Sequence, residues 1–388
     1  MLNMDEYFEA VRKARQRQAG NKCLREDSYV LHSVAGGLSA VLGGTVSASE
    51  LGRPPAHIDA DLSFVCGFES SKKSGEPLPR YIEKVKKEGP FTNVTLNRNE
   101  VYGDVLRSVI DGGDMYGSMQ NGSGKLAIIE YSSPNIAKPI GVGHLRSTII
   151  GEALSRIYEY GGYAVMRDNY LGDWGTQFGK LIYAYRAWGD KEKIRKNPIR
   201  ELKKLYVMFE ERAAEDEELM GEARELSRKL ENGDESVVSL WKEFRDLSIR
   251  EFEKLYEALG IKYDVYGGES PFVEGAKKLA RECIDKGICR RGEGGSIVAE
   301  VDGLPVFVMQ RGDGSTIYHS RDLAQLSFRV NELKADKILY VVGSEQALHF
   351  RQLFALAEEM GLLGECRPKH IGFGLVLGED GKRMSTRR

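Results

Sequence analysis

Residues 135–148, NIAKPIGVGHLRST, combine residue types that could bind a phosphate group. Gly141 and Gly143 have no Cβ, so a ligand can approach the backbone closely, and N–H groups at a helix start attract anions. His144 could donate a hydrogen bond to a phosphate and stabilise charge during displacement, while Lys138 adds a mobile ammonium. The same segment also fits a capped helix start with an incidental histidine, so the spacing alone leaves both interpretations open.

The C-terminal segment GEDGKRMSTRR is a loop rich in cationic and hydroxyl donors, which suit a polyphosphate ligand. A solvated basic tail is the alternative. This segment and the first loop each follow an apolar strand, in separate halves of the sequence, so both would open at the carboxyl edge of one sheet. That shared placement favours phosphate binding by both. The donors are Lys382, Arg383, Ser385, Thr386, Arg387 and Arg388.

Two acidic residues are candidates for binding a cation. Glu130 ends the apolar run LAIIE, and Asp322 follows Tyr318 by about one helical turn. Paired carboxylates could hold a cationic ligand, with Asn135 and Gln346 supplying neutral hydrogen bonds. Each acid taken alone is also explained by a helix cap or by surface exposure.

The elements that would position these residues form two α/β halves. From Leu126 the sequence predicts a buried strand (LAIIEY), a loop, a helix that stops at Gly161-Gly162, and a strand and loop (YAVMRDNYLGDWG). The second half has a helix at Leu323–Glu332, the strand KILYVVG, the helix QALHFRQLFALAEEMG and the strand HIGFGLVLG. Strand, helix and strand in succession predict one parallel α/β sheet.

An insertion of about residues 191–310 separates the halves, which span about 126–190 and 311–388. From Asp190 to about Gly260 the sequence predicts long helices, and their interleaved acids and bases indicate solvated faces with ion pairs. The remainder of the insertion, residues 261–310, is expected to mix short strands and turns.

Residues 1–118 are expected to form a separate small domain. The segment SVAGGLSAVLGGTVSASELGRPP predicts a loop. Arg80–Lys87 predicts a charged helix, and FTNVTLN predicts a strand. The glycine-rich DGGDMYGSMQNGSGK is a candidate linker, so residues 119–388 would make up the second domain.

Composition narrows the class of protein. The 388 residues suggest two or three domains, and 41% hydrophobic with 29% charged residues is typical of a globular chain. The 56 basic and 58 acidic residues leave a net charge of −2, so a nucleic-acid surface would have to be local. We expect no membrane span and no cleaved leader. The five cysteines lack C-x-x-C spacing, which argues against zinc or a disulfide framework and favours a reducing cytoplasm.

Five blocks resemble the class I arginyl-tRNA synthetases, in order, from residue 130 to the end of the sequence. They are EYSSPNIAKPIGVGHLRST, NYLGDWGTQFGKL, YHSRDLA, GSEQALHFRQLF and HIGFGLVLGEDGKRMSTR. The block around NYLGDWGTQFG is the most specific to that family, whereas the nucleotide loops alone indicate class I. Residues 1–118 resemble, more loosely, the family's N-terminal domain, which contacts the corner of the tRNA, through ADLSF and DMYG.

The resemblance implies a Rossmann-like parallel-sheet catalytic domain split by a mainly helical insertion, plus a small N-terminal α+β domain. It also implies activation of L-arginine by ATP, with Mg²⁺ carried by the ATP, and transfer of arginine to tRNA(Arg). No metal ligands from the protein are implied. The residues implied in catalysis are His144, Lys138, Arg383 and Ser385. Those implied in ATP binding are Gly141, Gly143, His144, Lys382, Arg383, Met384, Ser385 and Thr386. Those implied in arginine binding are Glu130, Ser133, Asn135, Tyr318, Asp322 and Gln346.

Both of the family's signatures are altered in this sequence. The first signature is usually His-x-Gly-His, and Gly141 replaces its first histidine. The second is usually Lys-Met-Ser-Lys-Ser, and residues 383–387 read RMSTR. In the family a lysine before the first signature is thought to compensate for the altered second signature, and Lys138 occupies that position. One lost contact typically costs about 2–4 kcal/mol of transition-state stabilisation, so we expect a slowed enzyme.

Members of this family carry an anticodon-binding domain after the second signature, where this sequence stops at Arg388. We therefore expect a truncated form, or a separate chain that supplies that domain, and otherwise a monomer. The alternative is a non-catalytic paralogue that binds arginine or the tRNA acceptor end, which Gly141 favours. A class I synthetase for another amino acid is disfavoured by NYLGDWGTQFG and by the two acids.

Overall fold

The computed structural model describes residues 4–20, 30–42, 45–65 and 78–377. The chain divides into two compact units. Unit 1 comprises residues 1–19, 122–159 and 163–388, and unit 2 comprises residues 20–121 and 160–162. Within the described ranges, no helix is both long and apolar enough to cross a membrane.

The centre of unit 1 is a four-stranded parallel sheet in the order β10-β9-β4-β5. Strands of the first half of the sequence thus lie beside strands of the second half, which confirms the prediction of one parallel α/β sheet. The four strands are β4 (Leu126–Glu130), β5 (Ala164–Asp168), β9 (Lys337–Gly343) and β10 (Lys369–Phe373).

Both faces of this sheet are covered, as is usual for parallel sheets. Leu126 and Ile128 of β4 pack into one apolar core, and Ala127 and Ile129 pack into the other. The first core receives side chains from α1, α10, α11 and α12, and the second from α4 and the helical insertion. The flanking helices are α1 (Asp5–Gly20), α4 (Val142–Tyr160), α11 (Tyr318–Asn331) and α12 (Ala347–Glu359).

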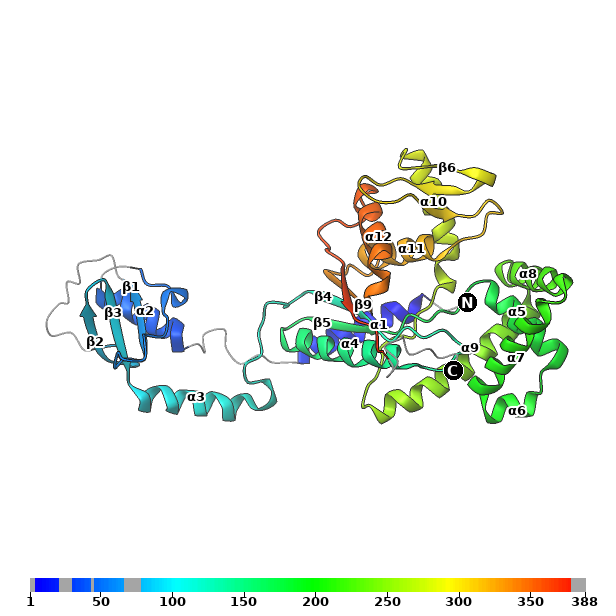
Figure 1. Cartoon of the computed structure of the whole chain (residues 1–388). Helices are drawn as coiled ribbons and strands as arrows, with labels where there is room; N and C mark the ends of the chain where they lie inside the picture. The colour runs from blue at the N-terminus through cyan, green and yellow to red at the C-terminus, as the bar shows by residue number, and fades with distance from the viewer. Residues whose placement is uncertain (1–3, 21–29, 43–44, 66–77, 378–388) are drawn as a thin grey trace. The chain divides into compact units, whose positions relative to one another are not determined.

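The insertion begins with a bundle of helices, which Figure 1 shows gathered in green. They are α6 (Lys191–Lys196), α7 (Pro198–Ala213), α8 (Glu217–Glu231) and α9 (Glu235–Ala258), and the last three pack against α5 (Thr176–Trp188), which precedes the insertion. Trp241 and Phe244 of α9 are fully buried at their centre. Exposed pairs such as Lys204–Glu201 and Lys254–Glu251 lie on their outer faces. The helical insertion with solvated, ion-paired faces is therefore confirmed.

The second part of the insertion contains more helix than predicted. A 3-10 turn (Ser270–Phe272) leads into α10 (Val273–Asp285), which precedes a three-stranded antiparallel sheet in the order β6-β7-β8. Val273, Ala276 and Ala280 recur at helical spacing and are buried, which is the signal that the sequence interpretation missed. The strands are β6 (Cys289–Arg291), β7 (Ile297–Ala299) and β8 (Phe307–Gln310), with a 3-10 turn at Glu293–Gly295.

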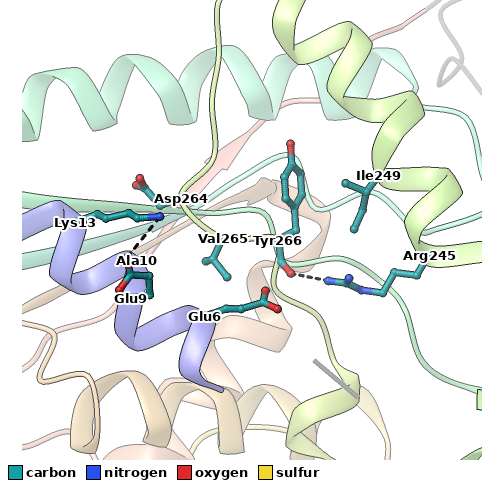
Figure 2. Close-up of a pocket in the computed structure, with 9 residues that line it drawn as sticks. All are labelled: Glu6, Glu9, Ala10, Lys13, Arg245, Ile249, Asp264, Val265 and Tyr266. Carbon is teal, nitrogen blue, oxygen red and sulfur yellow. Dashed lines mark hydrogen bonds and ion pairs between the residues drawn. The ribbon is translucent and has the colours of Figure 1, made fainter. Parts of the chain in front are cut away.

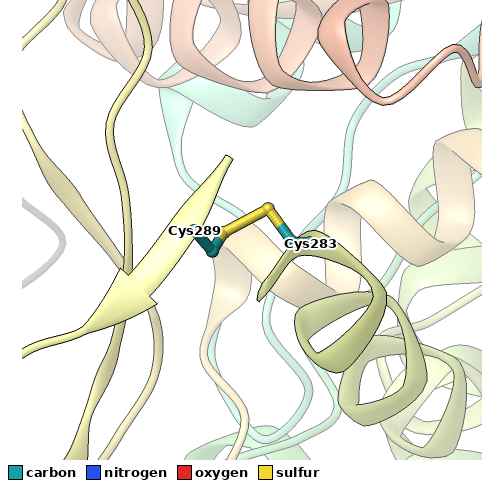
Figure 3. The surroundings of a disulfide bond; sticks show 2 residues. All are labelled: Cys283 and Cys289. Atoms are coloured by element: carbon teal, nitrogen blue, oxygen red, sulfur yellow. A yellow bond between two sulfur atoms is a disulfide. The ribbon is translucent and has the colours of Figure 1, made fainter. Parts of the chain in front are cut away.

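Cys283 and Cys289 form a disulfide, so the expectation that cysteine spacing supports no disulfide was wrong (Figure 3). Their Cα atoms lie 5.1 Å apart because the chain reverses between α10 and β6 at Gly287, whose φ is +74°. A glycine between two cysteines six residues apart could have indicated this reversal. Among the described residues, no group of three or more His, Cys, Asp or Glu side chains could hold a metal ion.

Residues 1–19 belong to unit 1, whereas the sequence analysis assigned them to a domain of residues 1–118. Helix α1 buries Tyr7, Ala10 and Ala14 in the same core as β4. Arg17 fixes the other end of the helix, because its Nη1 donates to Asp264 Oδ1 at 2.8 Å. Tyr7, Ala10 and Ala14 form a narrow apolar stripe on an otherwise charged helix, and that stripe determines where the helix packs.

Unit 2 is built on an antiparallel sheet in the order β1-β3-β2, with strands β1 (Leu62–Val65), β2 (Ile82–Glu88) and β3 (Phe91–Leu96). The helix predicted at residues 80–87 is instead β2, because Ile82 is buried and the strand pairs with β3. Lysines on an edge strand also discourage further pairing. The other elements are α2 (Val30–Leu42), α3 (Arg98–Gly112) and 3-10 turns at Ala48–Glu50 and Gly113–Met115.

The loop predicted from Ser33 to Pro55 is also partly wrong, since α2 covers it as far as Leu42. Val34, Leu38 and Leu42 recur at helical spacing and pack in the core of unit 2. This packing offsets the low helix propensity of the glycines. The turns that follow α3 and run to Gly124 agree with the glycine-rich linker predicted there.

Candidate active site

The parallel strands of unit 1 all end at one edge of the sheet. Glu130 ends β4, Asp168 ends β5, Gly343 ends β9 and Phe373 ends β10. The loops that follow these strands therefore leave from the same edge, where ligands of open α/β sheets bind. The predicted loop of residues 131–141, the block NYLGDWG and Gln346 all lie directly after these strands.

The loop after β4 has a strained backbone. Ser132, Ser133 and Ala137 have φ values of +71°, +48° and +60°, in the left-handed region that non-glycine residues rarely adopt. Such residues cost on the order of 1–3 kcal/mol each and cluster at functional sites. The surrounding structure holds the loop in place: the Ser132 N–H donates to Ser147 Oγ at 2.9 Å.

The block NYLGDWG supports this loop from the side. Asn135 forms a parallel bridge with Gly172, and a Cβ on Gly172 would lie 2.1 Å from Asn135 Oδ1. Asp173 is fully buried, accepts bonds from the Ser270 N–H at 3.1 Å and Ser270 Oγ at 3.0 Å, and has a pKa that burial raises to about 6. The block thus fixes Asn135, one of the predicted arginine ligands.

His144 lies in the first turn of α4. Its Nδ1 accepts the Gly141 N–H at 3.0 Å, so in the neutral ring the proton is on Nε2, which is a donor. A Cβ on Gly143 would meet no atom within 4 Å. Open space, a helix N-terminus and an imidazole donor together suit a phosphate.

Lys138 contacts side chains of α5 and α7. Its Nζ donates to Gln177 Oε1 at 3.3 Å and lies 5.5 Å from the centre of the Tyr206 ring. The structure therefore places this ammonium at the side of the site formed by α5 and α7.

Glu130 is buried and already paired. Its Oε2 lies 2.6 Å from Arg329 Nη2 and accepts a bond from Gln325 Nε2 at 3.1 Å. Burial raises the pKa of Glu130 to about 7, although the Arg329 guanidinium opposes this shift. The same Arg329 nitrogen donates to Asp168 Oδ2 at 2.6 Å, and burial also raises the pKa of Asp168. The sequence analysis missed Arg329 and Asp168, since no local pattern links them.

Tyr318 and Asp322 lie on one face of the first turns of α11, as their spacing predicted. Tyr318 is 49% exposed, which leaves its ring available to a ligand. The charge of Asp322 raises the pKa of both Glu130 and Glu269, so the three carboxylates lie in one region. Burial is the main cause of the Glu269 shift, to about 7, and Arg321 Nε donates to its Oε2 at 2.9 Å.

The remaining predicted ligands lie around this region. Ser133 donates its N–H to Asn169 Oδ1 at 3.1 Å, and among the described residues its buried Oγ has no hydrogen-bond partner. Gln346 is exposed at the end of the 3-10 turn Ser344–Gln346. The predicted phosphate-binding residues Lys382, Arg383, Met384, Ser385, Thr386, Arg387 and Arg388 lie outside the described residues.

A separate cavity of about 250 Å³ lies between α1, α9 and residues 264–266 of unit 1 (Figure 2). Charged side chains line it, including Lys13 of α1 and Arg245 of α9, whose guanidinium donates to the Tyr266 carbonyl at 2.7 Å. None of the residues predicted to bind ATP or arginine lines this cavity.

A parallel sheet with a glycine–histidine loop at its carboxyl edge, interrupted by a helical insertion, is the arrangement of a class I nucleotide-binding catalytic domain. Residues 106–388 match the family described as tRNA synthetases class I (R), catalytic domain. The chain belongs to this family, which confirms the resemblance seen in its sequence.

Curated relatives agree with this assignment. The chain is 40% identical over 370 residues to an arginine–tRNA ligase of Exiguobacterium sibiricum, covering 90% of the chain and 65% of that relative. It is 44% identical over 348 residues to one of Clostridium botulinum, covering 86% and 61%. The chain thus spans 61–65% of the length of these relatives.

Solved structures are also similar. A Plasmodium falciparum arginyl-tRNA synthetase has a TM-score of 0.61 and 28% identity, covering 76% of this chain and 53% of that one. A Thermus thermophilus arginyl-tRNA synthetase has a TM-score of 0.61 at 22% identity, covering 91% and 66%, and supports the fold alone.

Proposed function

We propose that the chain acts as an arginine–tRNA ligase, which activates L-arginine with ATP and transfers it to tRNA(Arg). The observation that carries the proposal is the proximity of Glu130, at the end of β4, to Asp322 on α11, near the edge where α4 begins with His144 in its first turn. Two carboxylates beside the exposed Tyr318 ring suit a guanidinium, which is planar and presents a fork of N–H donors.

The proposed arginine site uses each candidate residue in a definite way. Asp322 and the unbonded lone pairs of Glu130 accept the guanidinium N–H groups, and Tyr318 packs against its plane. Asn135, Ser133 and Gln346 supply neutral hydrogen bonds to the rest of the amino acid. The positive charge of the bound guanidinium would also be stabilised, because the side chains of Asp322, Glu130 and Glu269 make the region acidic.

In the proposed first step, the arginine α-carboxylate attacks the α-phosphorus of ATP. A phosphorus–oxygen bond forms to the carboxylate, the bond to the β-phosphate oxygen breaks, and pyrophosphate leaves. His144 Nε2–H donates to a phosphate oxygen, and Gly141 and Gly143 allow close approach to the backbone. Lys138 and the residues 382–386 are proposed to contact the leaving phosphates, and Arg383 and Ser385 to act in catalysis with His144.

In the second step, a ribose hydroxyl at the tRNA 3′ end attacks the activated carbonyl, and adenosine monophosphate leaves. Mg²⁺ would come with the ATP, held largely by phosphate oxygens and water. The proposal also includes a tRNA contact by the N-terminal domain and a cytoplasmic location. It further includes a monomeric state, unless a separate chain supplies an anticodon-binding domain.

Calorimetric titration of the folded chain with ATP and with L-arginine tests this proposal. We expect both to bind, and L-lysine to bind at least about tenfold more weakly, because a point charge cannot satisfy two fixed carboxylates as a planar fork does. Binding of neither ATP nor arginine to well-folded protein would contradict it.

A further inference from the structure

His349 contacts one of the two candidate guanidinium-binding carboxylates. It lies in the first turn of α12, and its Nε2 is 2.8 Å from Asp322 Oδ2 on α11. Both side chains are largely shielded, with 9% and 19% of their surfaces exposed. The bond joins two helices that flank β9, so it fixes the direction in which the carboxylate faces.

Neighbouring rings hold the imidazole in place. The ring centre of His349 lies 5.1 Å from that of Tyr318, 4.7 Å from that of His319 and 5.1 Å from that of Phe350. Packing on three sides restricts rotation of the ring about its χ angles. His349 is therefore a rigid donor rather than a mobile surface histidine.

The environment also indicates which ring nitrogen carries the proton. Nδ1 of His349 is buried, and no described residue bonds it. A proton on Nδ1 would thus be an unsatisfied buried donor, whereas a proton on Nε2 is bonded to Asp322. The nearest ring, His319, is kept neutral, because burial lowers its pKa to about 4. The other titratable groups that interact with the pair include Tyr318, Tyr170, Tyr340, Glu130 and the Glu269–Arg321 ion pair.

We propose that His349 is a positioning residue that orients the Asp322 carboxylate for a guanidinium through its Nε2–H. This inference rests on the proposed function. One Asp322 oxygen is held by His349, and the other accepts from the planar fork of the ligand. A fixed carboxylate plane favours arginine over lysine, whose ammonium donors rotate to meet any orientation.

Calorimetry on three variants of the full chain tests this role. His349→Phe keeps the ring but removes the donor, and we expect the Kd for L-arginine to rise about tenfold (~1.4 kcal/mol). His349→Gln keeps an N–H donor and should stay within about threefold of the unchanged chain. His319→Phe changes a ring of the same stack that does not bond Asp322, and is the matched control, expected to stay within about twofold.

Two further results distinguish positioning from a general structural role. The Kd for L-lysine should change less than that for L-arginine in His349→Phe. In an Asp322→Ala background, His349→Phe should have no further effect on arginine binding, since the residue acts through that carboxylate. An equal loss of affinity for arginine and lysine would contradict the proposal. Additive losses of arginine affinity in the double variant would contradict it as well.

Measurements on the unchanged chain keep the proposal testable if His349→Phe does not fold. In ¹⁵N spectra of imidazole-labelled protein, assigned by comparison with His349→Gln, His349 should be the Nε2–H tautomer. The Nδ1–H tautomer would overturn the proposal. Failure of the unchanged chain to bind arginine would overturn the proposed function and this role together, whereas binding that His349→Phe leaves unaltered would overturn only the role of His349.

Discussion

The guanidinium of Arg329 joins the ends of two neighbouring strands: its Nη2 lies 2.6 Å from Glu130 Oε2 and 2.6 Å from Asp168 Oδ2. All three side chains are almost completely buried. The rings of Tyr170 and Tyr340 lie 5.8 and 5.3 Å from the guanidinium carbon. An internal arginine thus holds Glu130, the acid proposed to bind the substrate arginine.

Removing this guanidinium should strongly destabilise unit 1. Arg329→Met leaves two buried carboxylates without a cation, and breaking a buried pair in this way typically costs about 3–5 kcal/mol. Urea unfolding measures the loss, with Arg156→Met as the control, because Arg156 makes an ion pair from a largely exposed position. If the free energies of unfolding of the two variants differ by less than about 1 kcal/mol, the buried network contributes little to stability.

The buried acids also predict how stability depends on pH. The pKa of Glu130 is raised to about 7, so the folded protein binds a proton in a range where the unfolded chain has lost it. The free energy of unfolding should therefore fall as pH rises from about 4.5, the ordinary range of a glutamate, to about 7. Each such group can change the free energy of unfolding by at most about 1.4 kcal/mol per pH unit.

Glu130→Gln removes one of these titrating groups while keeping a side chain of similar shape. Chemical unfolding between pH 5 and pH 7.5 should give a shallower decline in the variant than in the unchanged chain. Equal slopes would show that Glu130 is ionised throughout the range, held so by Arg329.

Gly172 is predicted to be essential for the position of Asn135. In Gly172→Ala the new methyl group would lie 2.1 Å from Asn135 Oδ1, and displacing that side chain should cost about 1–3 kcal/mol of stability and weaken arginine binding. Gly143→Ala is the stability control, since its Cβ would meet no atom within 4 Å. If both variants unfold at the same urea concentration, the close contact at Gly172 does not exist.

Gly141 stands where the family's first signature usually has a histidine, whose imidazole we propose would face a phosphate. If that imidazole contributes to the transition state, Gly141→His should speed pyrophosphate exchange on the order of tenfold or more, because one such contact is worth about 2–4 kcal/mol. His144→Ala should have the opposite effect and serves as the reference. An unchanged rate in Gly141→His would mean that water or Lys138 already supplies the contact.

The sequence predicted that Glu130 ends a buried strand and that Tyr318 and Asp322 share a helix face, because both patterns are local. That α11 lies close to the end of β4 depends on tertiary packing, although the two acids were proposed as a pair from their residue type. The Arg329–Asp168 bond could not be predicted, since the two residues are 161 positions apart and neither belongs to a motif. Residues of β2 were predicted to form a helix, and α1 was predicted to belong to the N-terminal domain. In both cases tertiary packing of a few apolar residues outweighed the charged composition. The contact between His349 and Asp322 depends on how α12 packs on α11, and no local sequence pattern indicates that packing.

Exchange of labelled pyrophosphate into ATP, with tRNA(Arg) present and either L-arginine or L-lysine added, tests the central claim most directly. The account predicts exchange that depends on arginine, is absent with lysine and is lost in Asp322→Ala. Measurable arginine binding without any exchange would contradict it and would instead support a non-catalytic arginine-binding module.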